Sequence, residues 1–297
     1  MNYSASGKLL LFGEYLVLKG SECLAIPLRY GQRMKVESTQ NNFIKWTSKV
    51  EDEVWFSSCF SKDLVSCNNA TDRPKAEILL NLLRLIKSQK PDLFREGIAF
   101  RIFADYPLEW GLGSSSTLIS LLAQWSGIDP YFLLEKSFGG SGYDIACSTA
   151  NSPILYRIKV NQAAAISLSP EITSKLLFVY SREKQSSADE IKRFKALKIT
   201  EDDIYKMDKI VSSAAKSEYI SDFERLVIES EGLISGILGY PAIKENKFKD
   251  YPFTVKSLGA WGGDFFMATY RNEYEARDYF NRLGYSVHFN YSQLIKS

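Results

Sequence analysis

The stretch YPLEWGLGSSSTLISLLAQW, residues 106–125, places two glycines and three serines between a β-prone run and an apolar helical segment. Gly111 and Gly113 allow the backbone to turn tightly and to approach a ligand without interference from a Cβ atom. Ser114, Ser115 and Ser116 would then stand at the N-terminus of the helix, where unpaired amide groups and the helix dipole favour phosphate. The stretch therefore predicts a phosphate-binding loop; the alternative is a serine-rich helix cap after a tight turn. It is not a Walker loop, because no GK[ST] follows.

Composition limits the classes of protein that fit. A chain of 297 residues is long for one hydrophobic core, which favours two domains. The net charge of +2, without a long block of one sign, indicates neither a nucleic acid nor an anionic membrane as partner. The apolar run LLLFGEYLVL is interrupted by Gly13 and Glu14 and is too short to span a bilayer. Four scattered cysteines without a CxxC pair favour a reduced, cytoplasmic enzyme or binding protein.

The chain contains one histidine, His288, in the strand-like run YSVHFN. A Ser-His-Asp or Cys-His arrangement would depend on this residue alone, and a zinc site would lack its usual histidines. We therefore expect His288 to be a structural or surface histidine, and the acid–base chemistry to use carboxylates and lysines.

Apolar periodicity and turn residues predict a mixed α/β or α+β chain in two parts. The runs KLLLF, YLVL, LAIPL and RMKVEST read as short strands, and NFIKWTSKV and DEVWFSSCF as a strand pair. Further strands are expected at IAFRIFA, PILYRIKV and LLFVYS. Helices are expected over residues 72–86, 129–138, 201–217 and 220–238. The weakly patterned segment VNQAAAISLSPE is the candidate boundary between domains 1–165 and 166–297.

Three further segments combine glycines with charged residues. Lys8, in SASGKLLLFGEYLVLKG, can direct its ammonium group toward phosphate or a substrate hydroxyl; a solubilising edge-strand lysine is the alternative. Asp144, in GGSGYDIACSTAN, can accept a proton from a substrate hydroxyl or simply cap the following turn. The segment KSLGAWGGDFF predicts either a phosphate contact or a hairpin turn.

Together these segments resemble the GHMP kinase superfamily, the small-molecule kinases named for galactokinase, homoserine kinase, mevalonate kinase and phosphomevalonate kinase. SGKLLLFGEYLVLKG is similar to the first motif of the superfamily, GLGSSS with Pro107 to the second, and KSLGAWGGDFF to the third. GSGYDIACST resembles the loop that bears the catalytic aspartate, and GYDIA matches a subgroup named after that phrase. The motifs stand in the order of the superfamily and cover nearly the whole chain.

This resemblance implies a fold and a reaction. The implied fold is α+β, with an N-terminal domain like ribosomal protein S5 domain 2 and a ferredoxin-like C-terminal domain. The implied reaction uses ATP and Mg²⁺ and transfers the γ-phosphate to a hydroxyl or phosphate acceptor. Mevalonate or phosphomevalonate lead as acceptors, with a sugar or an amino alcohol behind them. A monomer and a homodimer both stay open.

The resemblance also assigns roles to residues. Asp144 would deprotonate the acceptor hydroxyl, and Lys8 would keep Asp144 ionised and lower the pKa of the hydroxyl. Glu135 matches a second Mg²⁺ ligand, beside Ser115. The loop that would wrap the ATP phosphates consists of Gly111, Leu112, Gly113, Ser114, Ser115 and Ser116.

On the acceptor side, the resemblance places Glu14 and Tyr15 of the first motif and Gly262 and Gly263 of the third. GEY is closer to phosphomevalonate kinases than to mevalonate kinases, which have GEH. A phosphorylated acceptor would need further cations. The candidates are Arg29, Arg101, Arg157, Lys184 and Lys256, together with the run KQSS at 184–187.

Two residues depart from the pattern of the superfamily. Ser116 stands where alanine is usual, and Trp261 stands where the third motif usually has glycine. An indole at position 261 can stack on a ligand or impair catalysis. The alternative function is therefore a catalytically impaired protein that binds a nucleotide or phosphate ligand on the same fold. A decarboxylase on this fold is the third reading, against which GYDIA and GEY both argue.

Overall fold

The structure is a computed structural model that describes residues 1–158, 162–183, 193–194, 196–259 and 263–296. The chain forms two compact units that interleave along the sequence. Unit 1 comprises Met1–Gly7, Tyr30–Leu108 and Leu112–Thr149; unit 2 comprises Lys8–Arg29, Glu109–Gly111 and Ala150–Ser297. The sequence predicts one domain boundary, after residue 165, and this boundary stays a prediction.

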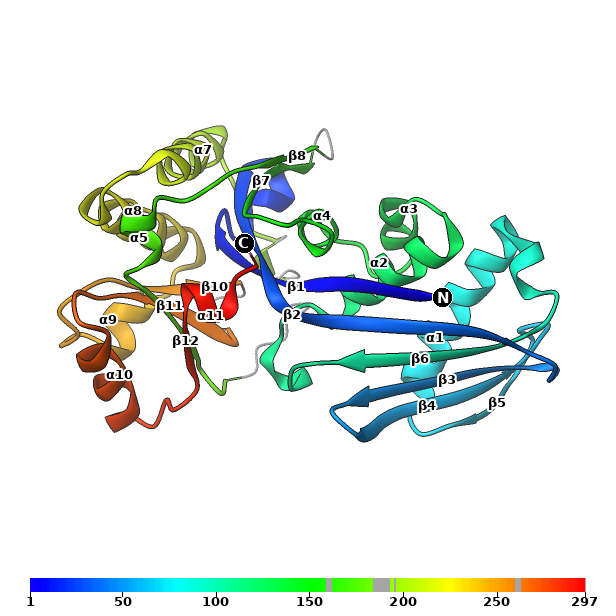
Figure 1. Ribbon diagram of the computed structural model, residues 1–297. Helices are drawn as coiled ribbons and strands as arrows, with labels where there is room; N and C mark the ends of the chain where they lie inside the picture. Colours follow the sequence, from blue (N-terminus) through cyan, green and yellow to red (C-terminus); the bar gives the residue numbers. More distant parts are fainter. Residues whose placement is uncertain (159–161, 184–192, 195, 260–262, 297) are drawn as a thin grey trace. The chain divides into compact units, whose positions relative to one another are not determined.

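Unit 1 is a twisted sheet with helices packed against it (Figure 1). Its strands are β3 (Phe43–Val50), β4 (Glu53–Ser61), β5 (Cys67–Ala70) and β6 (Gly97–Ala104), with parts of β1 (Asn2–Phe12) and β2 (Glu22–Thr39). The strand order is β5-β4-β3-β6-β2, and β1 pairs with β2. β3 and β6 run parallel, whereas β5/β4, β4/β3 and β6/β2 are antiparallel. The expected strand pair of β3 and β4 is confirmed.

The helices of unit 1 bury their apolar stripes on one face of this sheet. They are α1 (Arg73–Gln89), α2 (Ser114–Ser126), α3 (Pro130–Glu135) and α4 (Tyr143–Ser148), with short 3₁₀ turns at Pro91–Phe94 and Leu108–Trp110. Asp72 caps α1 as expected, because its side chain accepts from the amide of Lys75. Leu83 of α1 and Ile119 of α2 join Ile44 and Phe100 of the strands in one core, which fixes α2 on the sheet.

Unit 2 contains a four-stranded antiparallel sheet and most of the later helices. The sheet has the order β10-β11-β9-β12 and consists of β9 (Leu176–Tyr180), β10 (Val255–Leu258), β11 (Phe265–Thr269) and β12 (His288–Asn290). The N-terminal part of β2 pairs with β7 (Ile154–Arg157), which pairs with β8 (Gln162–Ala165). The helices are η1 (Leu16–Lys19), α5 (Pro170–Thr173), α7 (Glu201–Lys216), α8 (Ile220–Leu238), α9 (Ile243–Lys247), α10 (Glu273–Arg282) and α11 (Tyr291–Leu294).

Three local expectations are wrong. The run YLVL is the 3₁₀ helix η1 rather than a strand, because Tyr15 before it and Gly20 after it both have positive φ and turn the chain. LAIPL and RMKVEST form one strand, β2, in which the carbonyl of Pro27 still accepts a hydrogen bond from Lys296. The apolar turn expected after Asp144 is the short helix α4.

Candidate functional site

The glycine loop is built as the sequence predicts, and glycine is obligatory at its first position. Gly111 has φ +65°, and a Cβ atom there would lie 1.7 Å from Oδ2 of Asp264. Both residues belong to unit 2, so the start of the loop packs closely against the residue after Gly263. Trp110 packs its ring on Phe265, with centroids 6.1 Å apart. Only a residue without a side chain fits at position 111.

The second half of the loop begins helix α2 in unit 1. Gly113 is the N-cap residue, with φ +95°, and within the described part of the chain no side chain caps the helix. The first amide groups of an α-helix have no partner within the helix. Gly7 of β1 also approaches this point, since a Cβ atom on it would lie 2.9 Å from the carbonyl oxygen of Leu112. The start of α2 is thus an uncapped turn with positive electrostatic potential.

The three serines of this turn are not equivalent. Ser116 is buried, and its hydroxyl donates back to the carbonyl of Gly113 at 2.8 Å. Ser115 is exposed and Ser114 is half-buried. Therefore Ser114 and Ser115 can offer hydroxyl groups to a ligand, whereas Ser116 can offer only its backbone.

A cavity of about 210 Å³ adjoins Ser114 and Ser115 within unit 1. Its walls are mainly aromatic and apolar: Trp46, Trp55, Phe56, Ile78, Leu79, Ile102, Leu118 and Phe138. Trp46 is buried, and its indole nitrogen donates to Ser48 at 2.9 Å, which fixes the ring. Trp55 is 37% exposed. Flat apolar walls beside an uncapped helix start suit a ligand that has both a planar ring and an anionic group.

Sequence reasoning missed this cavity. The sequence predicts NFIKWTSKV and DEVWFSSCF only as strands, and Phe138 only as the end of a helix. The sequence feature that could have revealed the cavity is the tryptophan in each strand of the expected pair, because strand pairing brings such aromatic side chains close to each other.

Asp144 lies in the first turn of α4, half-buried, and its Oδ1 accepts the amide of Ile145 at 3.1 Å. α4 packs on α2, the helix that begins at the glycine loop. Burial raises the pKa of Tyr131, and the nearby carboxylates of Asp129 and Asp144 raise it further. The carboxylate of Asp144 therefore lies close to the start of α3.

The predicted pair of Lys8 and Asp144 spans the two units. Lys8 is half-buried on β1 in unit 2, and Asp144 belongs to unit 1. Their mutual approach stays a prediction.

The predicted acceptor-side residues lie in unit 2. Glu14 is 2% exposed, and its carboxylate pairs with Lys256 at 2.7 Å. Tyr15 is buried against Phe194, with ring centroids 5.2 Å apart. The carbonyl of Gly263 accepts from the Ser181 hydroxyl at 2.7 Å. Gly262, Trp261 and the run at 184–187 lie outside the described residues.

The two predicted metal ligands, Glu135 and Ser115, lie at the end of α3 and in the first turn of α2. Glu135 ends α3 with a side chain 72% exposed, and it pairs with Lys136 at 3.1 Å. Among residues that the structure describes, no group of three or more His, Cys, Asp or Glu side chains is arranged to hold a metal. Mg²⁺ that is bound together with phosphate groups keeps several waters and needs only one or two protein carboxylates. Ser115 and Glu135 therefore stay predictions.

The cations considered for a phosphorylated acceptor are already engaged. Arg29 donates to the carbonyl of Ile295, and Arg157 pairs with Asp208 at 2.9 Å. Arg101 pairs with Glu37, and Lys256 with Glu14. Lys184 is outside the described residues.

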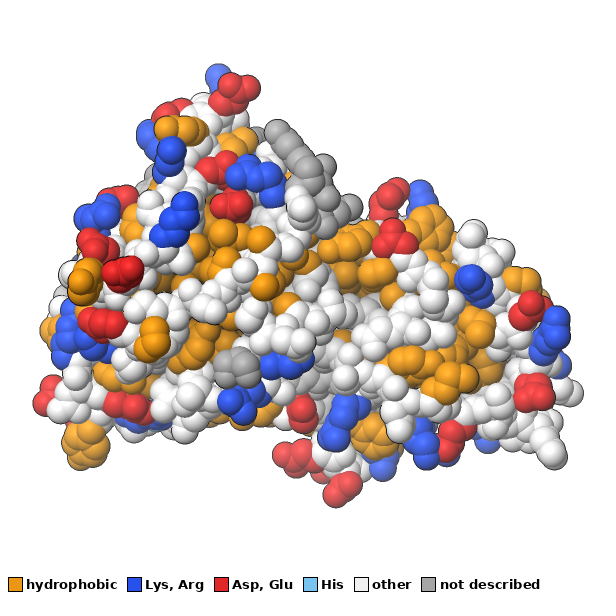
Figure 2. Space-filling view, turned by 45° about the horizontal axis from the view of Figure 1, so that its top comes forward, with side chains coloured by type: hydrophobic (Ala, Val, Ile, Leu, Met, Phe, Trp, Pro, Cys, Tyr) orange, Lys and Arg blue, Asp and Glu red, His pale blue; other side chains and the backbone are white. Residues whose placement is uncertain are grey.

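On the face drawn in Figure 2, basic and acidic side chains are interspersed, and the described residues show no extended patch of one sign. None of the helices in the described part of the chain has the length and apolar character needed to cross a membrane.

No family model and no curated protein matches the sequence. Solved structures do match. Mevalonate kinase from Methanococcus jannaschii aligns with a TM-score of 0.71 and 18% identity, over 100% of this chain and 98% of that one. The chain has the fold of the GHMP kinases.

Other structures with the GHMP kinase fold differ in what they bind. Streptococcus pneumoniae phosphomevalonate kinase, in complex with phosphomevalonate and AMPPNP, aligns with a TM-score of 0.71 and 17% identity, over 97% of this chain and 99% of that one. Lactococcus lactis galactokinase, complexed with galactose, aligns with a TM-score of 0.68 and 11% identity, over 100% and 95%. The expected α+β fold is confirmed, and the spread of these ligands leaves the acceptor open.

Proposed function

We propose that the chain is an ATP-dependent small-molecule kinase of the GHMP type. The observation that carries the proposal is the position of the aromatic cavity beside the uncapped start of α2, within one unit. The helix start favours phosphate, and the cavity offers flat apolar walls to a nucleobase. The fold supports this use, since the phosphomevalonate kinase neighbour was solved with AMPPNP.

In this proposal the amides of Ser114, Ser115 and Ser116 bind phosphate oxygens. The hydroxyl of Ser115 and the carboxylate of Glu135 supply hard oxygen ligands of the kind that Mg²⁺ prefers. When bound, Mg²⁺-ATP supplies the phosphoryl group and neutralises part of its charge.

Asp144 acts as the general base for a hydroxyl acceptor. The acceptor oxygen forms a bond to the γ-phosphorus, its proton passes to the Asp144 carboxylate, and the bond from phosphorus to the departing ADP oxygen breaks. Lys8 keeps Asp144 ionised by its positive charge. The hydrogen bond from the Ile145 amide orients the carboxylate.

Mevalonate and phosphomevalonate are the leading acceptors, followed by sugars. A coupled assay of ADP release over mevalonate, phosphomevalonate and galactose would test the proposal and identify the acceptor class. ATP binding without ADP release in the presence of any of these acceptors would favour the alternative, a catalytically impaired binding protein. The departure from the third motif at Trp261 is the reason for considering this alternative.

Asp144→Asn provides the sharper test. Turnover should fall by roughly 10²–10⁴, while the Kd for ATP stays unchanged. Asp129→Asn is the matched control, because it neutralises an exposed carboxylate nearby that caps α3. Near-native turnover of Asp144→Asn would remove the general-base role.

A further inference from the structure

The turn that joins β1 to η1 has a strained backbone. Tyr15 has φ 60° and ψ −48°, and the amide of Leu16 donates to the carbonyl of Glu14 at 2.5 Å. These values define a γ-turn with positive φ at its central residue, which is rare for a residue with a side chain. Such a conformation persists only where the surrounding structure enforces it, and it is typical of functional sites.

The approach to this turn is equally constrained. Gly13 has φ +95°, and a Cβ atom on it would lie 2.6 Å from Cβ of Cys23. Cys23 is fully buried on β2, so it has no room to move away. The chain therefore enters the turn along a path that only glycine permits.

A buried charged cluster holds the turn from the other side. We call it the Glu14–Lys256–Glu231 cluster. Nζ of Lys256 lies 2.7 Å from Oε1 of Glu14 and 3.3 Å from Oε1 of Glu231, and it lies 5.5 Å from the ring centroid of Phe12. All three charged side chains are at most 5% exposed. Among the residues that the structure describes, the second carboxylate oxygen of each glutamate has no hydrogen-bond partner.

Two carboxylates and one ammonium group give a buried cluster with one excess negative charge when all three are ionised. A buried charge is tolerated only when its partner stands in a defined position. Lys256 therefore fixes the side chain of Glu14, and the γ-turn fixes the same residue through its backbone.

The cluster connects two of the glycine-marked segments. Glu14 lies in the first, and Lys256, on β10, is the first residue of the third, three residues before Gly259. Glu231 anchors both to helix α8. All of these residues belong to unit 2, so the connection lies within one compact body.

We propose that Lys256 is a positioning residue that holds the Glu14–Leu16 turn in its γ-turn form and couples it to β10, the strand that begins the third glycine segment. Its link to catalysis rests on the proposed function and on the resemblance to GHMP kinases, which places Glu14 and Tyr15 on the acceptor side. Glu14 then acts through its ion pair rather than by contact with substrate.

The strain of the turn has its own test, which needs no acceptor. Tyr15→Ala and Tyr15→Gly both remove the ring, but only glycine adopts positive φ freely. Tyr15→Gly should therefore melt at a higher temperature than Tyr15→Ala, the reverse of the order usual within helices and strands. A higher melting temperature for Tyr15→Ala than for Tyr15→Gly would contradict the strain of the turn.

The positioning role is tested with Lys256→Met and the double variant Glu14→Gln/Lys256→Met. Amide hydrogen exchange of a peptide covering residues 12–20 should accelerate in both, because the turn loses its anchor. The acceptor that ADP release identifies should show a KM raised about tenfold, while the KM for ATP stays within about twofold.

The double variant guards against a merely structural explanation. It leaves one buried carboxylate of the cluster, Glu231, whereas Lys256→Met leaves two, so its melting temperature should recover relative to Lys256→Met while the acceptor KM stays raised. Recovery of melting temperature and acceptor KM together would overturn the positioning role. Failure of the wild type to release ADP with any acceptor would instead contradict the proposed function; the exchange and melting experiments would still decide the role of Lys256 in holding the turn.

Discussion

The hydroxyl groups of Ser120 on α2 and Ser148 on α4 lie 2.5 Å apart in the core of unit 1. Ser148 also donates to the carbonyl of Ile145 at 2.7 Å, so the proton shared by the two serines comes from Ser120. Both side chains are 2% exposed. A single buried chain of hydrogen bonds thus runs from the helix that begins at the glycine loop to the residue after Asp144.

Ser148→Ala should destabilise the protein by about 1–3 kcal/mol, because the Ser120 hydroxyl is left buried without its acceptor. The double variant Ser120→Ala/Ser148→Ala should lose less, since it removes both polar groups. Urea unfolding midpoints measure both effects. Thr149→Ala is the control, an exposed position next in the chain. Equal midpoints for Ser148→Ala and Thr149→Ala would contradict the role of the serine pair.

Trp55→Ala should weaken ATP binding by about 1 kcal/mol or more, roughly fivefold or more in Kd, because a nucleobase loses a stacking wall. The partly exposed ring contributes little to the core, so the melting temperature should change little. Val54→Ala is the matched control, since Val54 is an exposed neighbour outside the cavity lining. Isothermal titration calorimetry with a non-hydrolysable ATP analogue measures the Kd of each variant. Equal Kd values for Trp55→Ala and Val54→Ala would exclude nucleobase stacking on Trp55.

The sequence predicted those features whose cause is local. Asp72 and the apolar stripe behind it determine α1, and the glycines and serines of residues 111–116 determine the loop and the start of α2. The error at YLVL arose because the positive φ of Tyr15, a residue that normally avoids it, depends on tertiary contacts. The Glu14–Lys256–Glu231 cluster joins residues far apart in the sequence, so no local pattern could have revealed it.

Glu231 should make stability depend on pH near neutrality. Burial raises the pKa of Glu231 to about 7, and the charge of Glu14 adds to this although Lys256 opposes it. Because the folded state holds the proton more tightly than the unfolded state, the free energy of unfolding should decrease as pH rises from about 4.5 to about 7. The total decrease is of the order of 3 kcal/mol.

Glu231→Gln should reduce this decrease to the part that comes from Glu14, whose pKa burial also raises, and it should be more stable than the wild type at pH 8, with little difference at pH 5. Melting temperatures across the pH range measure the effect. Glu229→Gln, an exposed neutralisation on the same helix, should retain the wild-type profile. A wild-type profile that stays flat between pH 5 and 8 would show that Glu231 is ionised throughout.

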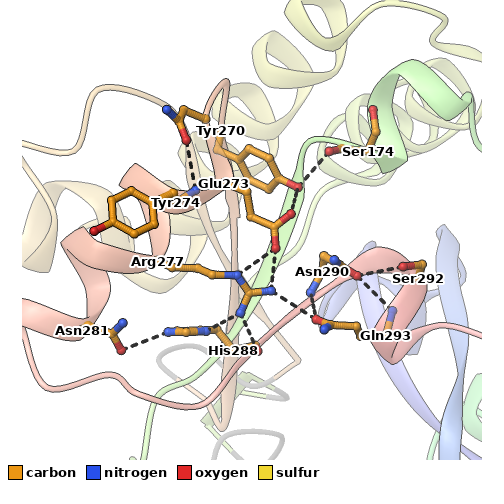
Figure 3. Close-up of polar contacts among 11 residues, drawn as sticks. Ser174, Tyr270, Glu273, Tyr274, Arg277, Asn281, His288, Asn290, Ser292 and Gln293 are labelled. Atoms are coloured by element: carbon orange, nitrogen blue, oxygen red, sulfur yellow. Dashed lines mark hydrogen bonds and ion pairs between the residues drawn. The ribbon is translucent and has the colours of Figure 1, made fainter.

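His288 should give a pH effect of opposite sign in the C-terminal part of unit 2. Figure 3 shows its ring beside the guanidinium of Arg277, which also contacts Glu273 and Gln293. Nδ1 lies 2.6 Å from Nη1 of Arg277, a donor, and Nε2 lies 3.1 Å from Oδ1 of Asn281, an acceptor. This arrangement fits the neutral ring with its proton on Nε2.

Burial lowers the pKa of His288, and the positive charge of Arg277 lowers it further. The unfolded state therefore binds a proton more readily, and stability is lost as pH falls through the ordinary value of 6.5 toward the folded one. Solvent screens this partly exposed ring, so the loss should stay below about 1 kcal/mol.

The effect of His288 is best measured in the Glu231→Gln variant, because Glu231 changes stability in the opposite direction over the same pH range. There, hydrogen exchange of a peptide covering residues 286–294 should accelerate between pH 7 and 5 after correction for intrinsic rates, and His288→Asn should abolish that acceleration. Since the chain has one histidine, persistence of the acceleration in His288→Asn would assign it to another group.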